Sequence, residues 1–268
     1  MALSRPVALT IAGSDSSGGA GVVADLKTFQ ALGVWGAVAV AAITAQNTVG
    51  VTATHLVPPA LITAQIAAVT ADMEVAAAKT GMLGSAAGVR AAAAGLRDAG
   101  IALVVVDPVL MSKHGDVLLA DDALDALRSE LLALATVVTP NLPEAGALLG
   151  RTVENRDAMA AAAQALQRLG PPWVLLKGGH LDDGDASPDL LAGPDGLEWL
   201  EGPRLAQPHT HGTGCVLSAA LTAYLARGCD PREACSKAKR FVTAAIAAGG
   251  PLGRGVGPVD PGAVSQGA

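Results

Sequence analysis

Aromatic side chains are scarce in this chain. Of its 268 residues, 51% are hydrophobic, but only 2% are aromatic. The rings belong to Phe29, Trp35, Trp173, Trp199, Tyr224 and Phe241. The high apolar content excludes a disordered chain. We therefore expect a core built from Ala, Val and Leu, in which helices and strands approach each other closely.

Long apolar runs are missing as well, although the mean hydropathy is +0.43. The longest apolar stretches, 31–45 and 215–226, have 15 and 12 residues, fewer than the roughly 18 that a membrane-spanning helix needs. A segment rich in Gly and Ser follows the first apolar run, where a signal-peptide cleavage site would be expected. We predict neither a membrane span nor a secretion signal.

Positive charge is sparse and unclustered. The chain has 18 basic and 24 acidic residues, a formal net charge of −6, and no basic cluster longer than Lys237–Arg240. Nucleic-acid binding requires a concentrated basic face, so no nucleic-acid partner is expected. Cys215, Cys229 and Cys235 are an odd number of cysteines without a disulfide framework, which favours the reducing cytoplasm.

Short apolar runs alternate with helical patterns along the whole chain. Because strands that are apolar on both faces and separated by helices belong to parallel sheets covered on both sides, we predict one α/β domain over residues 1–268 with a mostly parallel sheet. The predicted helices include 20–32 and one opened by Asp230-Pro231, with Glu233 in its first turn. The predicted strands are 7–12, 34–44, 75–79, 101–107, 136–139 and 173–177.

A first glycine-rich loop, 13–21, connects a predicted strand to a predicted helix. Its glycines loosely fit a dinucleotide-binding pattern, but no acidic residue occurs between Asp25 and Asp72 to bind a ribose. No Gly-Lys-Ser/Thr follows, which excludes a phosphate loop of the common nucleotide-triphosphatase type. A tight structural turn is the simplest interpretation. The carboxylates Asp15 and Asp25 beside the loop favour a ligand site at the carboxyl ends of the strands.

A second loop, His209–Cys215, precedes an apolar helical run. Gly212 and Gly214 allow successive backbone N–H groups to point into one concavity, and the helix N-terminus adds partial positive charge, so the loop predicts an anion hole. The same field should lower the pKa of the Cys215 thiol. Three alternatives stay open: a plain helix entry with a packed cysteine, a zinc site with His209 and His211, and a cysteine nucleophile paired with a histidine.

Taken together, the motifs resemble the hydroxymethylpyrimidine/phosphomethylpyrimidine kinases of thiamine biosynthesis, in the ribokinase-like superfamily. The match extends almost from end to end, and the specificity comes from several motifs in one order. These motifs are 12–21 with 24–27, 44–48, 79–83, 107–109, 139–145, 177–180, 210–215 and 257–259.

The resemblance implies a three-layer α/β/α fold with an eight- or nine-stranded sheet, usually in a homodimer. It implies ATP- and Mg²⁺-dependent phosphorylation of 4-amino-5-hydroxymethyl-2-methylpyrimidine and then of its monophosphate. Gly212, Gly214 and Cys215 would form the anion hole, with Cys215 where many sugar kinases of the superfamily carry a catalytic Asp. Gly13, Asp25, Gln46 and Met82 would contact the pyrimidine, and Val109 would line the same pocket.

The chemistry of two of these side chains supports such roles. Gln46 carries a primary amide, which offers both a donor and an acceptor to the edge of an aminopyrimidine. A loop-capping amide is the alternative for Gln46. Cys215 is positioned to accept the proton of the substrate hydroxymethyl group. Since no aromatic residue falls inside a matched motif, we expect aliphatic faces rather than ring stacking to hold the pyrimidine.

Charged residues at other strand ends predict the phosphate and metal chemistry. Lys177 ends an apolar strand and would neutralise ATP phosphates, unless it is a surface lysine. Asp107 also ends a strand and would orient Mg²⁺ through water. Asn141 and Glu144 would support Mg²⁺ indirectly, although their spacing equally suits a helix capping box.

The sequence departs from the family at a few positions, which are Met111, His114 and Val256. They fall where a nucleotide or a covering flap would be expected. Two other functions remain open: a pyridoxal kinase of the same superfamily, since pyridoxal also has a hydroxymethyl group beside an aromatic ring, and a catalytically silent pyrimidine-binding protein.

Overall fold

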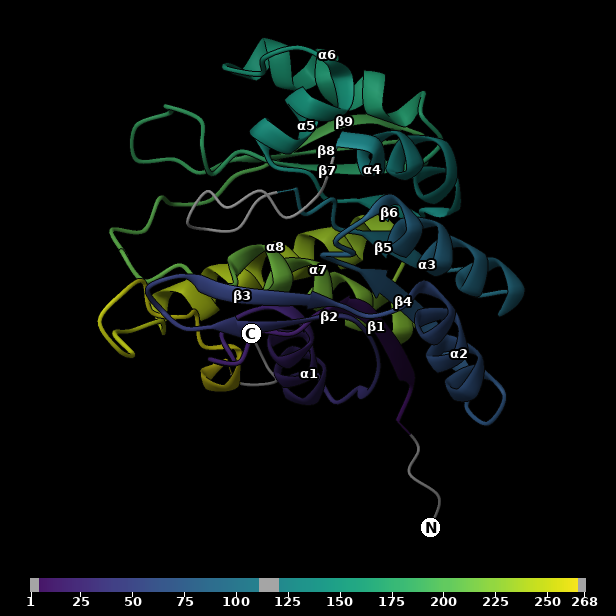
Figure 1. The fold of residues 1–268 in the computed structure, drawn as a ribbon. Helices are drawn as coiled ribbons and strands as arrows, with labels where there is room; N and C mark the ends of the chain where they lie inside the picture. Colours follow the sequence, from purple (N-terminus) through teal and green to yellow (C-terminus); the bar gives the residue numbers. More distant parts are fainter. Residues whose placement is uncertain (1–4, 111–120, 265–268) are drawn as a thin grey trace.

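A computed structural model describes residues 5–110 and 121–264 of the chain (Figure 1). Within this described part, nine strands form one sheet in the order β3-β2-β1-β4-β5-β6-β7-β8-β9. The run from β2 to β7 is parallel throughout, whereas β3, β8 and β9 are antiparallel to their neighbours. The strands are β1 (Val7–Gly13), β2 (Trp35–Gln46), β3 (Val51–Leu56), β4 (Val75–Thr80), β5 (Val104–Val106), β6 (Val137–Val138), β7 (Trp173–Lys177), β8 (Asp189–Gly193) and β9 (Gly196–Leu200).

Helices cover both faces of the sheet. The side chains of α1, α7 and α8 pack into one apolar cluster with the sheet, and those of α2, α3, α4, α5 and α6 pack into a second cluster on the other face. The helices are α1 (Gly21–Ala31), α2 (Pro59–Thr70), α3 (Ala86–Asp98), α4 (Asp121–Ala126), α5 (Leu142–Leu149), α6 (Arg156–Gln167), α7 (Thr213–Ala226) and α8 (Pro231–Ala247). After α4 the chain continues as a π-helical turn, Leu127–Leu131, and a 3-10 turn, Leu132–Leu134; a third short turn is Pro261–Ala263.

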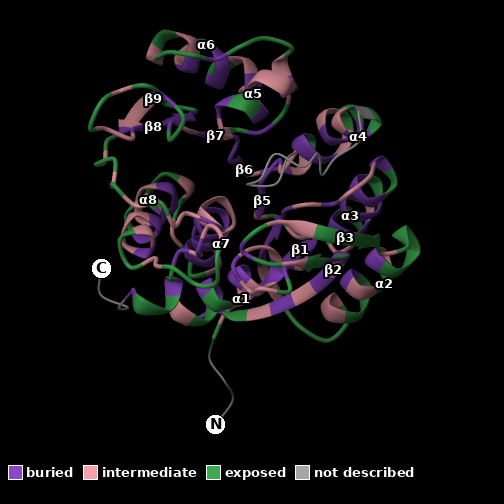
Figure 2. Ribbon diagram, turned by 60° about the vertical axis from the view of Figure 1, so that its left-hand side comes forward, coloured by how far each residue is buried: buried purple, intermediate pink, exposed green. Residues whose placement is uncertain are grey.

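The sequence pattern of the central strands explains this layering. In β5, Val104 and Val106 belong to one apolar cluster and Val105 belongs to the other. Because successive strand side chains point to opposite faces, a continuous run of valines is buried on both sides of the sheet. Figure 2 shows buried residues concentrated on the central strands and on the sides of the helices that face them. The predicted three-layer α/β/α fold is confirmed.

Most predicted elements are present, with differences at the edges. The helix that begins at Pro231 has Asp230 as its N-cap, whose side chain accepts a hydrogen bond from the Glu233 amide, as predicted. The prediction of a strand over 101–107 was too long. Its ladder with β4 pairs Ala78 with Val104 and ends at Val106, so the preceding residues lie outside the ladder. The antiparallel edge strands β3, β8 and β9 were not predicted.

Candidate active site

A large cavity lies at the carboxyl ends of the parallel strands, where ligands bind in open α/β sheets. Its volume is about 850 Å³. The two glycine-rich loops border it, together with the ends of β4 and β7 and the first turn of α7. Among the described residues that line it are the following predicted site residues: Gly13, Gln46, Met82, Asp107, Val109, Asn141, Glu144, Lys177, Gly212, Gly214 and Cys215. No Phe, Trp or Tyr belongs to this described lining.

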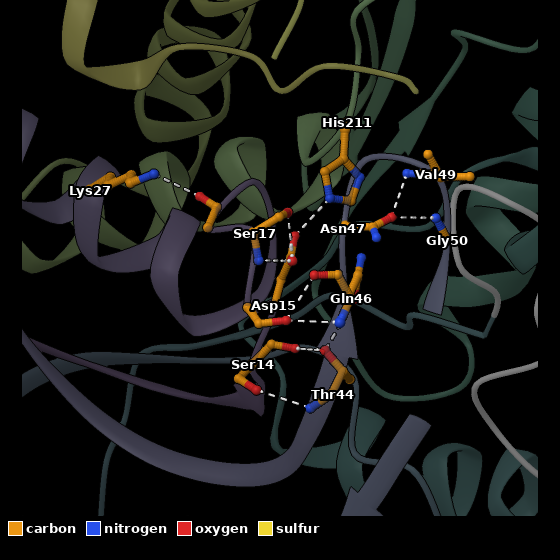
Figure 3. A network of polar contacts seen from close by, with 12 residues as sticks. Ser14, Asp15, Ser17, Lys27, Thr44, Gln46, Asn47, Val49, Gly50 and His211 are labelled. Atoms are coloured by element: carbon orange, nitrogen blue, oxygen red, sulfur yellow. Dashed lines mark hydrogen bonds and ion pairs between the residues drawn. The ribbon is translucent and has the colours of Figure 1, made fainter. Parts of the chain in front are cut away.

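Gln46 is fixed in the cavity wall by the first glycine loop. The Ser16 hydroxyl bridges the backbone of Gln46, with Oγ at 2.8 Å from both its N–H and its carbonyl oxygen. The Thr44 hydroxyl lies 2.9 Å from the Ser14 carbonyl and 3.2 Å from Gln46 Oε1. Figure 3 shows these contacts converging on the end of β2. The loop therefore fixes the backbone of Gln46, and Thr44 of the same strand contacts its amide oxygen.

Three aliphatic groups lie near the same end of the cavity. The Gly13 amide donates a hydrogen bond to the Met82 carbonyl (3.0 Å), and a Cβ at Gly13 would overlap the thioether end of Met82. Val109 lines the cavity after β5. Gly13 therefore leaves the space in which Met82 lies, and the structure brings the predicted aliphatic contacts together with Gln46.

Asp25 has a different position from the other predicted pyrimidine contacts. Its side chain is completely buried in α1, and it is absent from the described lining of the cavity. One carboxylate oxygen accepts a hydrogen bond from Thr10 Oγ1 (2.6 Å), and the other pairs with Lys79 Nζ (2.9 Å). Lys79 itself is completely buried in β4 and lines the cavity. The structure thus places Lys79, rather than Asp25, at the cavity surface.

The anion-hole loop is shaped by a close approach of the two glycine loops. Gly212 is the N-cap of α7 with φ of +81°. A Cβ at Gly212 would lie 1.9 Å from the Gly19 carbonyl oxygen, so only glycine fits. Beside this contact, His211 Nε2 lies 2.7 Å from Asp15 Oδ2, with both side chains buried (Figure 3). The first turn of α7 therefore presents its free N–H groups to the cavity, as an anion hole requires.

Asp15 is held ionised by this arrangement. Burial alone would raise its pKa, but hydrogen bonds from His211 and from the Ser17 side chain and amide outweigh burial and hold the pKa below 3.8. A charged carboxylate therefore fixes His211 next to the anion hole.

The zinc hypothesis for this loop finds no support. The part of the chain that the structure describes contains no metal-binding group of three His, Cys, Asp or Glu residues, and His209 Nδ1 accepts a hydrogen bond from the Gly257 amide (3.0 Å).

Cys215 differs from its prediction in one respect. The helix field was expected to lower the pKa of its thiol, but burial raises that pKa to about 11, against the opposing effects of the Lys79 charge and the Gly21 backbone amide. The prediction failed because desolvation of a thiolate outweighs the dipole of a helix first turn. At neutral pH the thiol is therefore almost entirely protonated.

Lys177 and two carboxylates form a charged cluster beside the start of α7, where a Cβ at Gly214 would lie 3.5 Å from Lys177 Nζ and 3.8 Å from Asp107 Oδ2. Lys177 Nζ lies 3.1 Å from Asp107 Oδ1 and 3.7 Å from Glu144 Oε2. Asp107 also accepts hydrogen bonds from Thr139 Oγ1 (3.1 Å) and Ser218 Oγ (3.2 Å). Burial would lower the pKa of Lys177, but the adjacent carboxylates outweigh it and raise the pKa, so the lysine is charged.

Asn141 and Glu144 serve as a helix cap and as cavity wall at once. The Asn141 side chain accepts from the Glu144 amide (2.8 Å), and the Glu144 carboxylate accepts from the Asn141 amide (2.7 Å), which is a complete capping box at the start of α5. Burial raises the pKa of Glu144 to about 7, while Lys177 opposes this shift. Both alternatives considered for this pair are therefore compatible with the structure.

These carboxylates fit Mg²⁺ only through other groups. Both oxygens of Asp107 accept hydrogen bonds from protein groups, and the described residues offer no cluster that would enclose a metal. Mg²⁺ commonly keeps its waters and binds phosphates with one or two carboxylates. The cavity therefore suits a Mg²⁺ ion carried on nucleotide phosphates, with Asp107 and Glu144 near its waters.

Several residues of the site were not predicted. The buried Lys79 and the Ser16 and Thr44 hydroxyls form contacts that no local pattern specifies, because their partners are distant in sequence.

Val256, a predicted departure from the family, lies on a C-terminal loop and donates its amide to the Thr48 carbonyl (2.9 Å). Met111 and His114 lie outside the described residues. In the described chain, no helix combines the length and apolarity that crossing a membrane requires.

Comparisons with known proteins show what this chain is similar to. Residues 15–260 match the family model described as phosphomethylpyrimidine kinase. The chain is 50% identical over 257 residues to the hydroxymethylpyrimidine/phosphomethylpyrimidine kinase of Streptomyces coelicolor, covering 96% of this chain and 94% of that protein.

Two solved structures share the fold. The pyridoxal kinase from Staphylococcus aureus in complex with AMP-PCP and pyridoxal has a TM-score of 0.89 and 38% identity, covering 97% of this chain and 94% of that one. The phosphomethylpyrimidine kinase from Clostridium difficile has a TM-score of 0.80 and 41% identity, covering 90% and 100%. The fold is therefore ribokinase-like.

Proposed function

The chain belongs to the phosphomethylpyrimidine kinase family, and we propose that it phosphorylates 4-amino-5-hydroxymethyl-2-methylpyrimidine with ATP and then converts the monophosphate to the diphosphate. It is a phosphotransferase of thiamine biosynthesis. One observation carries this proposal: a single cavity contains an amide-bearing, aliphatic subsite at Gln46 and an anion-binding helix turn at Gly212. A small polar ring and a phosphate are thereby accommodated in the same cavity.

The pyrimidine subsite selects by edge and by shape. The Gln46 amide pairs with the amine and ring nitrogen of the pyrimidine, because it presents a donor and an acceptor side by side. Its Oε1 is already oriented by Thr44. Met82 and Val109 cover the ring faces. Asp25 contributes from behind the wall through Lys79 rather than by direct contact.

The phosphate subsite stabilises charge. Backbone N–H groups at Gly212, Gly214 and Cys215 and the ammonium of Lys177 neutralise the transferred phosphoryl group, which is where most catalysis of phosphoryl transfer arises. The hydroxymethyl oxygen bonds to the γ-phosphorus, the bond to the β-phosphate oxygen breaks, and ADP leaves. The hydroxyl proton passes to the thiolate form of Cys215, a minor form whose help is needed only late in a loose transition state.

ATP is the phosphoryl donor in this proposal, supported by the AMP-PCP complex of a similar pyridoxal kinase. Mg²⁺ accompanies the nucleotide and offsets the charge of its phosphates when bound. Asp107 and Glu144, the latter oriented by its capping box with Asn141, would hold the waters of such an ion. This arrangement explains why the carboxylates lie beside Lys177 instead of forming a closed metal cage.

Cys215→Ala tests the role of the thiol. We expect kcat for the hydroxymethylpyrimidine to fall more than its KM rises, and the second phosphorylation to suffer less, because a phosphate acceptor is already ionised near neutral pH. The assay couples ADP formation to NADH oxidation for each substrate, and Cys229→Ala is the control, since Cys229 does not line the described cavity. Full kcat in Cys215→Ala would remove the base role.

Pyridoxal kinase activity is a second candidate. It is favoured by the similarity to a pyridoxal kinase that was solved in complex with AMP-PCP and pyridoxal. The same coupled assay with pyridoxal decides: a kcat/KM for pyridoxal above that for hydroxymethylpyrimidine would reverse the assignment. A protein that binds the pyrimidine tightly without ATP turnover would instead be a silent binder.

We further propose that residues 1–268 act as one kinase domain in a cytoplasmic homodimer. Free cysteines in the described chain suit a reducing compartment. Exposed apolar side chains on one face of the β2–β3 ladder, Ile43, Ala45 and Ala53, offer a surface for a second copy. Sedimentation velocity of the purified protein tests the oligomer, and a monomer at micromolar concentration would contradict it.

A further inference from the structure

The buried ion pair between Lys79 and Asp25 is not explained by substrate contact. Its partners come from β4 and α1, and Thr10 of β1 closes the group by its hydrogen bond to Asp25. All three side chains are completely buried. Three elements of the fold thus converge on one charged group beneath the cavity.

Such a pair is a poor way to stabilise a core. Removing two charges from water costs about as much as their attraction returns, and replacing a buried pair by apolar residues is often neutral or stabilising. The surroundings here are strongly apolar, with Ala24 and Ala77 close to the pair in sequence and buried in the core. A role in the chemistry of the cavity accounts better for two charges at this position.

Cys215 is the chemical group that shares the cavity with Lys79. Helix α7, which carries Cys215 in its first turn, packs against α1 and β4, the elements that carry Asp25 and Lys79, and also against β1 and β5. Lys79 and Cys215 both line the cavity. Two further charged groups lie beside the same turn, because a Cβ at Gly214 would be 3.8 Å from Asp107 Oδ2 and 3.5 Å from Lys177 Nζ.

We propose that the buried Lys79–Asp25 ion pair, on the two elements β4 and α1 against which helix α7 packs, is an electrostatic positioning device for the Cys215 thiol, with its positive and negative partners acting in opposite directions. Neither residue needs to touch the substrate, so both are positioning residues. Only the consequence for catalysis rests on the proposed function, because the reactivity of the Cys215 thiol is measurable without turnover. Asp25 thereby keeps a link to the reaction although it lies outside the cavity lining.

The direction of each effect follows from charge. Burial would lower the pKa of Lys79, but the charges of Asp25, Cys215 and Asp107 outweigh burial and keep the lysine protonated. Its positive charge favours a neighbouring thiolate and lowers the pKa of Cys215, whereas the carboxylate of Asp25 raises it. The two partners of one ion pair therefore act on the same thiol with opposite sign.

The opposite effects of Lys79 and Asp25 on the thiol give a test that separates an electrostatic role from a purely structural one. Lys79→Met removes the positive charge, and we expect alkylation of Cys215 by iodoacetamide to slow by about tenfold or more, since one pKa unit is tenfold in thiolate. Asp25→Asn keeps the shape of the carboxylate and removes its charge, so alkylation should accelerate by about the same factor. A packing defect would change both variants in the same direction.

The measurement is site-resolved mass spectrometry of the intact chain across a pH series, with Cys229 of the same molecule as reference. Thr10→Val is the matched control, because it removes a hydrogen bond to Asp25 without changing a charge. It should leave the ratio of the Cys215 alkylation rate to the Cys229 alkylation rate within about twofold of the wild-type ratio. Lys79→Arg should restore the wild-type rate. If Lys79→Met does not fold, Lys79→Gln gives the same test with a polar, uncharged side chain.

Changes of the same sign in both variants, or no change relative to Cys229, would overturn the proposal. If alkylation shifts in opposite directions and kcat for the hydroxymethylpyrimidine follows with a displaced pH profile, the proposal and the base role of Cys215 both hold. If alkylation shifts but kcat does not follow, the electrostatic role of the ion pair stands and the base role of Cys215 fails.

Discussion

Gly212→Ala is a direct test of how the two glycine loops form the anion hole. Gly212 has a φ of +81°, and a Cβ there would lie 1.9 Å from the Gly19 carbonyl oxygen. The substitution adds one methyl group and no charge. It therefore acts on the backbone alone, either by shifting the first loop or by rotating the first turn of α7.

The structure sets the expected magnitude. An alanine in the left-handed region costs about 1 to 2 kcal/mol, and overpacking at a site that cannot relax adds roughly 1 to 3 kcal/mol. At roughly 2.1 cal/mol/K of unfolding entropy per residue, the sum of about 2 to 5 kcal/mol corresponds to a fall in Tm of roughly 4 to 9 °C for a chain of 268 residues. If one anion-hole N–H turns away from the phosphoryl group, kcat falls about 10²- to 10³-fold.

The assay combines thermal unfolding with the coupled kinase measurement. Gly33→Ala is the matched control: Gly33 has a φ of +73° and nothing within 4 Å of the added Cβ, so it carries the left-handed cost without the clash. The difference between the two variants isolates the contact with Gly19. Equal Tm losses and an unchanged kcat in Gly212→Ala would refute the argument that this contact shapes the anion hole.

Three further predictions concern single side chains. Gln46→Leu keeps the volume but removes the amide, so we expect KM for the hydroxymethylpyrimidine to rise at least about tenfold while KM for ATP is unchanged; equal effects on both would contradict the edge-pairing role. The pKa of Asp15 is held below its usual value by the hydrogen bonds from His211 and Ser17, so its carboxylate stabilises the fold above the unfolded pKa, and that contribution is lost as pH falls through the lower folded pKa; Asp15→Asn should flatten the acid limb of Tm against pH, and an unchanged limb would refute this. The pKa of Glu144 is raised to about 7, so its contribution to stability is present at low pH and is lost as pH rises through about 7; Glu144→Gln should therefore gain Tm relative to the unmodified protein between about pH 5 and pH 8, and a constant difference would count against it.

Much of the fold was predictable because the central strands are apolar along their whole length. Valines on β5 and the apolar run of β1 are buried on both faces, and such runs have few alternatives to a parallel sheet. The antiparallel edges were not predictable on the same grounds. Most of β3 is exposed, so no core pattern marks it, and the β8–β9 hairpin is signalled only by Pro194-Asp195-Gly196.

The candidate site was predictable in its members but not in its electrostatics. Local motifs placed Gln46, Lys177 and Cys215 at strand ends and at a helix start, where loops converge. The pKa of the Cys215 thiol depends on how deeply the fold buries it and on charges far away in sequence. The position of Asp25 likewise depends on its pairing with Lys79, which is 54 positions away.

The contacts of the C-terminal loop with Thr48 join segments that are synthesised at very different times. The Gly255 amide donates to Thr48 Oγ1, a contact between residues 207 positions apart, and Val256 donates to the Thr48 carbonyl. During translation at about 5 to 20 residues per second, the turn after Gln46 therefore emerges on the order of 10 to 40 s before the partner that fixes it. Until residues 255 and 256 are synthesised, the turn beside Gln46 lacks two of the hydrogen bonds that hold it in the folded protein.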